Sequence, residues 1–273
     1  ESAAPMPVSP PSANLWEPGG WGGGGWYWST AFHPTRDGVI YLGQDVGGVS
    51  KTTDHGMTWR MINNGLTDYS VYSLAVDRSN PDTVYAATGG GLNKSTDAGE
   101  HWQFIPHTGK KELRITGERN FSVRAIAVDP VNGNNVYAAS PGGRIYKSRD
   151  GAKTWSVAYE TNATSAKPVY SVAVAAKQTA LVVAATEACG LLLSEDAGKT
   201  WRELDTPKQA TSAVFADTDP NIMFGAFGKD GVWKSTDRGK TWNRGSEGIP
   251  EKADIRDLTA VQGDDIPHFE EHT

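Results

Sequence analysis

An eight-residue motif recurs five times in the chain, and it constrains the fold more than any other feature of the sequence. The copies follow the pattern Ser-x-Asp-x-Gly-x-Thr-Trp and span residues 52–59, 95–102, 148–155, 194–201 and 235–242. Their aspartates, at positions 54, 97, 150, 196 and 237, are separated by 43, 53, 46 and 41 residues. The third copy carries its glycine one position earlier, at Gly151, and the first copy begins with Thr52. A period of about 40–50 residues predicts a repeat architecture in which each copy marks one structural unit.

Each motif ends a longer unit made of short apolar runs. Before the second copy lie the runs 71–77 and 83–88, separated by a turn at 79–82 and followed by glycines at 89–91. Residues 123–129 with 135–140, and 169–175 with 181–186, repeat this plan before the third and fourth copies. Apolar runs of about six residues bounded by Gly, Pro, Asn and Asp are typical of β-strands. With the motif as the turn between a third and a fourth strand, the sequence predicts an all-β fold, a β-propeller of four-stranded blades.

The residues of the motif are predicted to be structural. The Asp carboxylate can accept hydrogen bonds from amides of its own turn, and the Gly can adopt a left-handed backbone. The Trp side chain is large enough to pack between neighbouring blades. We therefore expect the five aspartates to hold the scaffold, and not to bind a metal ion or to catalyse a reaction.

The composition excludes several classes of function. Lys and Arg number 26 against 32 Asp and Glu, a net charge of −6, so nucleic acid is not expected as a partner. No apolar run approaches the roughly 18 residues of a membrane-spanning helix. The single cysteine, Cys189, rules out an internal disulfide framework, and the six histidines show no paired metal-ligand spacing. The sequence therefore predicts no metal site and no cofactor.

The strands can be grouped into five blades, at 26–63, 69–107, 119–160, 167–205 and 211–246. Residues 255–261 look like the first strand of a sixth blade, and residues 14–16 look like an outermost strand without its motif, the piece that commonly closes a propeller ring. Residues 1–13, rich in Pro, Ser and Ala, are expected to be a flexible lead-in to a propeller domain at 14–273. We expect an incomplete ring, completed by further blades or by another chain. The alternative is a closed five-bladed ring with a C-terminal tail.

The loops of such a fold divide between two faces. Turns after the first and third strands lie on one face, and turns after the second strand and between blades lie on the other, where propellers usually bind ligands. Asp45 follows the second strand of the first blade, on this ligand-binding face. Counting back from the motifs places Thr88, Pro141, Glu187 and Gly228 at its position in the other blades. The Asp is thus particular to blade one, with Glu187 the nearest chemical match. A turn-capping role for Asp45 is the alternative.

Aromatic and basic residues are predicted on the same face. An indole ring stacks on the apolar face of a sugar, so Trp21, Trp26 and Trp28, separated partly by glycines, can form a sugar-binding platform. Trp28 alternatively belongs to the core. The connection 103–122 holds the extra length of the longest repeat and carries Arg114 and Arg119, two further candidates for substrate binding.

The motif resembles the Asp-box repeat of sialidases, sortilin-type receptors, photosystem assembly factors and xyloglucan-degrading enzymes, over residues 15–262. Residues 22–25, 32–34 and 45–48 are further similar to the N-terminus of glycoside hydrolase family 74. That resemblance implies an inverting hydrolase of xyloglucan-type β-glucan with two seven-bladed propellers around a cleft. It also implies that Asp45 is the general base and that the acid comes from the second propeller. Within this chain Glu187, three blades away, is the weaker candidate for a second carboxyl, which inverting hydrolysis places roughly 6.5–9.5 Å from the first.

Two other functions remain open. A sialidase requires three arginines, a tyrosine nucleophile and a Phe/Tyr-Arg-Ile-Pro motif, from which the run Leu-Arg-Ile-Thr at 113–116 departs. A non-catalytic propeller would present its loops, 103–122 above all, to a protein partner. Whether the chain is an enzyme is thus undecided, and its partner is a polysaccharide or a protein. Because the chain begins at Glu1 without Met, which fits a removed export signal as well as a chain boundary, we expect an exported protein, secreted, periplasmic or at the cell surface.

Overall fold

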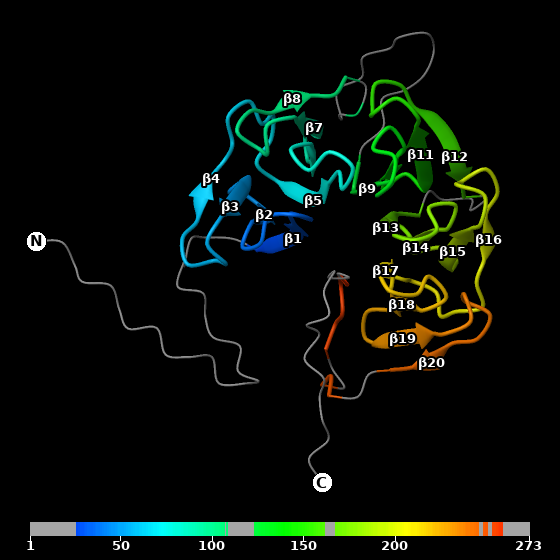
Figure 1. Cartoon of the computed structure of the whole chain (residues 1–273). Coiled ribbons are helices and arrows are strands. Elements are labelled where there is room, and N and C mark those ends of the chain that lie inside the picture. Colours follow the sequence, from blue (N-terminus) through cyan, green and yellow to red (C-terminus); the bar gives the residue numbers. More distant parts are fainter. Residues whose placement is uncertain are drawn as a thin grey trace, which may run out of the picture.

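The computed structural model of the chain is an all-β molecule of five four-stranded sheets (Figure 1). The structure describes residues 26–106, 108, 123–161, 167–245, 248–250 and 253–258. No helix in the described part of the chain has the length and apolar character needed to cross a bilayer. The predicted fold class, a β-propeller of four-stranded blades, is confirmed.

Each sheet is an antiparallel meander whose strands follow one another in chain order from the inside of the molecule to the outside. Blade one contains β1 (Tyr27–Phe32), β2 (Ile40–Gln44), β3 (Val49–Thr52) and β4 (Arg60–Met61). Blade two contains β5 (Val71–Val76), β6 (Val84–Thr88), β7 (Gly91–Ser95) and β8 (Gln103–Phe104). Blade three contains β9 (Ala125–Val128), β10 (Val136–Ala139), β11 (Arg144–Ser148) and β12 (Ser156–Glu160).

The last two described blades have the same plan. Blade four contains β13 (Val169–Val174), β14 (Val182–Thr186), β15 (Gly190–Ser194) and β16 (Arg202–Glu203). Blade five contains β17 (Ser212–Phe215), β18 (Met223–Ala226), β19 (Val232–Ser235) and β20 (Asn243–Arg244). Figure 1 shows the innermost strands β1, β5, β9, β13 and β17 arranged around the centre of the molecule. Each contacts the next, whereas no comparable contact joins β17 to β1 in the described structure, so the five blades form an open arc.

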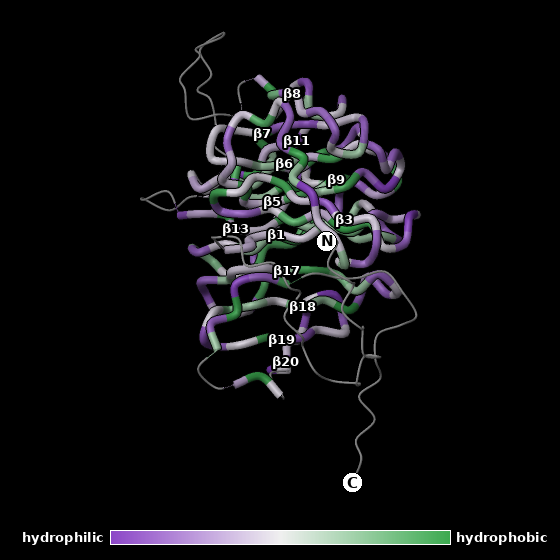
Figure 2. The backbone as a smooth tube through the Cα atoms, turned by 90° about the vertical axis from the view of Figure 1, so that its left-hand side faces the viewer, coloured by the Kyte–Doolittle hydropathy of each residue, from purple (hydrophilic) through white to green (hydrophobic). Residues whose placement is uncertain are grey.

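Four apolar clusters lie between successive blades and form the core. The second strands of blades two, three and four are buried on both faces because each lies between two neighbouring blades; every residue of β6, β10 and β14 is buried. This explains why these runs are continuously apolar instead of alternating. Figure 2 shows the same distribution from the side, with apolar stretches in the strands and polar residues in the outer loops.

The five motif turns, called box turns below, have one geometry. In the fourth, Asp196 Oδ1 accepts the amide of Thr200 at 2.8 Å, and its Oδ2 accepts the Thr200 hydroxyl at 2.7 Å. These hydrogen bonds lower the pKa of Asp196 to about 2. Two consecutive residues of the turn, Ala197 and Gly198, have positive φ angles of 58° and 81°. The turn therefore requires two left-handed residues, and only one of them is glycine.

The same pairing of left-handed residues accounts for the irregular third motif. There Gly151 and Ala152 have φ angles of 71° and 73°, so the glycine has exchanged places with its neighbour without changing the backbone path. Ser148 Oγ accepts the amide of Ala152 at 2.9 Å, as Ser194 Oγ accepts that of Gly198 at 2.7 Å. The hydrogen bonds of the Ser and the Asp thus offset the strain of a left-handed alanine.

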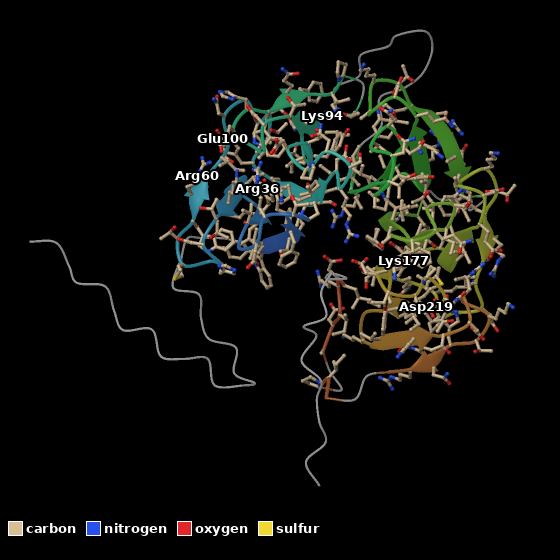
Figure 3. All side chains as sticks on the ribbon, in the orientation of Figure 1. Arg36, Arg60, Lys94, Glu100, Lys177 and Asp219 are labelled. Carbon is tan, nitrogen blue, oxygen red and sulfur yellow. The ribbon has the colours of Figure 1, made fainter. Side chains whose placement is uncertain are left out.

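A lysine and a tyrosine on each of the first three blades attach that blade to the next box turn. Lys147 Nζ and Tyr137 Oη both donate to the carbonyl of Ala197, at 2.7 and 3.0 Å. Blade one uses Lys51 and Tyr41 on the carbonyl of Ala98, and blade two uses Lys94 and Tyr85 on that of Gly151. At the periphery Arg60 and Glu100 form a further ion pair between blades one and two (Figure 3). Polar and apolar contacts together therefore fix the angle between blades.

Residues 253–258 follow blade five and run alongside β17. Leu258 donates its amide to Ser212 Oγ at 3.1 Å, as Ala213 does to Ser171 Oγ at 3.0 Å and Ile126 to Ser73 Oγ at 3.3 Å. Leu258 thus occupies the place that the innermost strand of a following blade takes elsewhere in the arc. Only the bridge between Ile255 and Gly228 gives this segment strand character.

Candidate functional site

The box turns identify the two faces of the arc. In each blade the box turn donates an amide to the turn between the first and second strands; in blade two Ala98 donates to Asp82 at 2.7 Å. Both kinds of turn therefore lie on one face, the box face. Asp45 follows β2 and lies on the opposite face, where each innermost strand also begins. We call the channel opening on that face, formed by Trp28, Tyr72, Arg124 and Tyr170, the mouth.

Asp45 is fixed at the start of a tight turn. Its amide donates to the carbonyl of Trp26 at 3.0 Å, which places the turn against the segment leading into β1. Asn63 holds the other side: its Nδ2 donates to the Gly47 carbonyl and its Oδ1 accepts the Val49 amide, both at 2.8 Å. The Asp45 Oδ1 atom is buried and has no hydrogen-bond partner among the described residues. The backbone of this turn is thus anchored, whereas one oxygen of the Asp45 carboxylate has no partner among the described residues.

The strand registers refine the comparison of Asp45 with the other blades. Tyr27 pairs with Gln44 and Val71 pairs with Thr88, so Thr88 corresponds to Gln44 and the residue at the position of Asp45 is Gly89. Counting back from the motif missed this by one residue because β6 and β7 are joined by a shorter turn. The conclusion is unchanged: among the five blades, only the first and the fourth carry an acidic residue here.

Glu187, the acidic residue of blade four, is committed to an ion pair. Its Oε1 lies 2.7 Å from Lys167 Nζ, and its Oε2 accepts the hydroxyl of Tyr170 at 2.8 Å. The hydrogen bond from Lys167, followed by that from Tyr170, lowers the pKa of Glu187. A general acid must be protonated when substrate is bound, so this environment favours a binding role for Glu187 over proton donation.

Aromatic side chains extend from blade one onto the mouth. Trp26 is 77% exposed and Trp28 is 41% exposed, so Trp28 is not a core residue. The Trp28 ring stacks on Tyr72 of blade two, with centroids 5.0 Å apart and an interplanar angle of 17°. The Arg124 guanidinium of blade three lies 4.8 Å from the centroid of the same Tyr72 ring. A row of planar groups therefore crosses three blades beside the Asp45 turn.

A cavity of about 1050 Å³ occupies the channel below the mouth. Its lining includes Trp28, Tyr72, Arg124 and Tyr170, but neither Asp45 nor Glu187. The candidate carboxylates therefore lie outside the channel, on the surface around its mouth. At the box face, Arg78 of blade two and Asp217 of blade five form an ion pair of 2.9 Å that joins these blades across the channel. A ligand that reaches the mouth thus enters from the face of Asp45.

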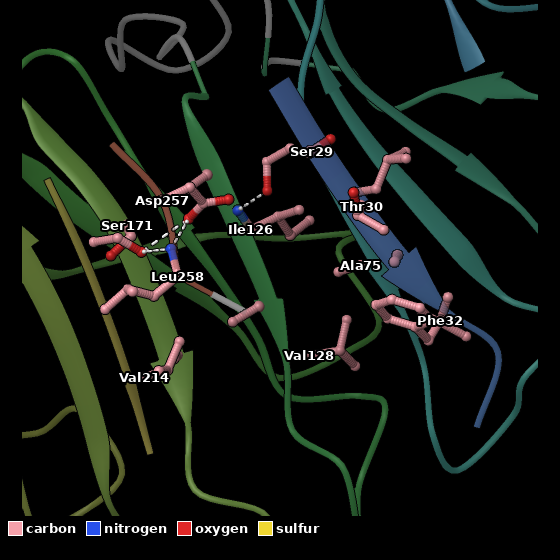
Figure 4. A pocket seen from close by; sticks show the side chains of 18 of the residues that line it. Ser29, Thr30, Phe32, Ala75, Ile126, Val128, Ser171, Val214, Asp257 and Leu258 are labelled. Atoms are coloured by element: carbon pink, nitrogen blue, oxygen red, sulfur yellow. Dashed lines mark hydrogen bonds between the residues drawn. The ribbon is translucent and has the colours of Figure 1, made fainter. Parts of the chain in front are cut away.

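Asp257 is a carboxyl group inside this cavity that the sequence did not single out. It accepts hydrogen bonds from Ser212 Oγ at 2.8 Å and from the Leu258 amide at 2.9 Å. Figure 4 shows Asp257 between Ser29 of β1 and Ser171 of β13. The Asp257 side chain is exposed to solvent in the channel. The surrounding protein nevertheless desolvates its carboxyl group enough to raise its pKa.

Three predicted site residues, Trp21, Arg114 and Arg119, lie outside the described residues. Trp26 and Asp45 are brought together, with Trp28 beginning the aromatic row next to them. Among the described residues no group of three or more His, Cys, Asp or Glu could hold a metal ion. The site can therefore offer an aromatic platform, an arginine at the mouth, and one acidic side chain that has no partner in the described part of the chain.

No protein-family profile matches the chain. Among curated proteins it is similar to a xyloglucanase of Hypocrea jecorina, at 28% identity over 247 residues, which cover 81% of this chain and 26% of the relative. The chain thus spans about a quarter of the length of that relative. Among solved structures it is similar to an ancestral enzyme of glycoside hydrolase family 74, with a TM-score of 0.70 at 20% identity over 89% of this chain and 34% of that one. The resemblance to these propellers noted from the sequence is confirmed.

The fold is shared with a protein of another kind. A chain from a crystallised nidogen/laminin complex has a TM-score of 0.61 at 13% identity, covering 85% of this chain and 84% of that one. At this identity the likeness concerns the fold alone. Function must therefore be argued from the site.

Proposed function

We propose that the chain is a carbohydrate-binding propeller of the glycoside hydrolase type, which binds β-glucan of the xyloglucan kind across the mouth. The observation that carries the proposal is the row formed by Trp28, Tyr72 and Arg124 beside the Asp45 turn. Exposed, ordered aromatic rings stack on pyranose rings, and adjacent polar groups bind their hydroxyls. The similarity to a xyloglucanase supports the choice of polysaccharide.

In this proposal Asp45 supplies one half of an inverting hydrolytic pair. Its Oδ1 has no hydrogen-bond partner among the described residues. In the proposed role, the Asp45 carboxylate accepts a proton from water at the edge of a bound glycan. Glu187 is held as a carboxylate by Lys167 and is not the proton donor. The chain therefore binds the glycan and provides the base, and hydrolysis requires a second, protonated carboxyl group. Because such polysaccharides lie outside cells, the proposal includes export of the chain.

Affinity electrophoresis tests this function directly. The chain would be run through native gels that contain xyloglucan, mixed-linkage β-glucan or starch. Starch is an α-glucan and serves as the control. We expect retardation in xyloglucan and none in starch. Equal mobility in all gels would contradict the proposal.

A non-catalytic scaffold that binds a protein is the second candidate, since a chain of the nidogen/laminin complex shows that this fold is not confined to hydrolases. Under this alternative the contact would be the connection 103–122, which lies mostly outside the described residues. Failure to bind any β-glucan would leave this candidate as the better account.

A further inference from the structure

Arg124 differs from Lys167 and Arg256, two other cations near the mouth, in whether a carboxylate pairs with it. Lys167 Nζ lies 2.7 Å from Glu187, and Arg256 Nη2 lies 2.9 Å from Asp254. Within the residues that the structure describes, no carboxylate forms an ion pair with Arg124, although its side chain is exposed to solvent. Of these three cations near the mouth, Arg124 is the one without a carboxylate partner in the described part of the chain.

Aromatic contacts hold this guanidinium in one place. Arg124 stacks on the Tyr72 ring at 4.8 Å, and Trp28 stacks on the same ring at 5.0 Å. Because Trp28, Tyr72 and Arg124 come from successive blades, the tyrosine ring lies between the indole and the guanidinium. No described residue accepts a hydrogen bond from the Arg124 side chain, so within this part of the structure its N–H groups are free. An ordered guanidinium with a free edge is suited to bidentate hydrogen bonding with a carboxylate.

Glu187, the acidic residue of blade four beside the mouth, is already paired. Tyr170 of blade four turns its hydroxyl to Glu187, which also binds Lys167. The Arg124 charge acts on Tyr170, lowering its pKa against the larger effect of burial, but it is not among the causes of the lowered pKa of Glu187. Among the described residues an aromatic ring, and no paired carboxylate, lies against Arg124, so we look to a ligand for that carboxylate.

We infer that Arg124 binds a carboxylate on the glycan, so that the preferred ligand is an acidic β-glycan containing uronic acid. A sugar ring packs against the exposed aromatic row that begins at Trp28, and the carboxylate at C6 of a neighbouring residue pairs with the free edge of Arg124. This inference rests on the proposed function, since it assigns the acidity of a ligand at the same mouth. It makes Arg124, already a member of the glycan-binding row, the determinant of specificity for charge.

Two tetrasaccharides that differ only at C6 test the inference. The β-1,4-linked tetramer of glucuronic acid carries carboxylates where cellotetraose carries hydroxymethyl groups. Isothermal titration at low ionic strength should show the acidic tetramer binding about tenfold or more tighter, as a charge-assisted hydrogen-bond pair implies. Raising the salt concentration should reduce this preference, because the ion pair is exposed.

The variants Arg124→Gln and Arg124→Lys complete the test. Arg124→Gln should remove the preference, so that the acidic tetramer and cellotetraose bind with equal affinity, while Arg124→Lys should retain part of the preference. Thermal melting confirms that each variant is folded. Equal wild-type affinity for both tetramers, or a preference that survives in Arg124→Gln, would overturn the inference alone. Binding of neither tetramer nor of xyloglucan would overturn the proposed function as well.

Discussion

Lys147 of blade three donates a hydrogen bond of 2.7 Å to the carbonyl of Ala197, in the box turn of blade four. This contact between neighbouring blades recurs at Lys51 and Lys94, each of which binds the following box turn. Blade four has Leu193 at this position, and blade five has Lys234, which is exposed and lies over Phe224. The lysine thus stabilises the arc only where a following box turn is present to accept it.

Replacing Lys147 by Ala should therefore destabilise the fold more than replacing Lys234 by Ala. Lys147 is 5% exposed, and its removal leaves a buried carbonyl with one donor fewer, at a cost of about 1–3 kcal/mol. Lys234→Ala removes an exposed side chain and should cost less than about 0.5 kcal/mol. Urea unfolding measures both. Equal losses would show that the inter-blade hydrogen bond contributes nothing particular to stability.

The box turns predict how stability depends on pH. Hydrogen bonds from Thr154 lower the pKa of Asp150 to about 2, below its ordinary value of 3.8. A carboxylate whose pKa is lower in the folded state stabilises the fold above about pH 4, and this contribution is lost as the pH falls through about 2. The urea midpoint of the wild type should thus fall between pH 4 and pH 2. Asp150→Asn should lower it at pH 7 and converge with the wild type near pH 2. A difference between the two proteins that stays constant with pH would rule out the ionised box.

Gly65, in the connection between blades one and two, allows a close approach of backbones. It has a φ of +85°, and a Cβ at this position would lie 2.3 Å from the carbonyl oxygen of Trp102. Gly65→Ala should cost about 3 kcal/mol or more, from left-handed strain and overpacking together. Gly248, with a φ of +77° and nothing within 4 Å of its Cβ position, is the matched control. Gly248→Ala should cost about 1–2 kcal/mol. Similar losses in the two variants, measured by thermal unfolding, would show that the contact with Trp102 is not restrictive.

Any hydrolysis by the chain should depend on Asp45 and not on Glu187. Asp45→Asn removes the proposed base, so release of reducing ends from xyloglucan should be lost. Glu187→Gln removes a group that Lys167 holds as a carboxylate, so the rate at saturating substrate should be kept. Release that survives in Asp45→Asn, or that disappears in Glu187→Gln, would reverse the assignment of roles.

The motif was sufficient to predict the scaffold because each box turn is local: the Ser, Asp, Gly and Thr that make it lie within eight residues. The mouth was harder to predict because Tyr72, Arg124 and Tyr170 come from different blades. They meet only because each lies at or next to the beginning of an innermost strand. The runs at 71–76 and 169–174 contain the only signal, a tyrosine before a serine in an apolar strand. Thr88 was placed wrongly because turn length varies between blades, which no count from the motif can reveal.

Titration of xyloglucan oligosaccharide into the wild type, Trp28→Ala and Phe104→Ala tests the central claim most directly. Phe104 is a comparably exposed aromatic residue, but it lies on the outermost strand β8 and away from the mouth. If the aromatic row binds glycan, Trp28→Ala should weaken binding at least about tenfold, which corresponds to about 1.4 kcal/mol, and Phe104→Ala should bind as the wild type does. Unchanged affinity in Trp28→Ala, or an equal loss in both variants, would contradict a glycan site at the mouth.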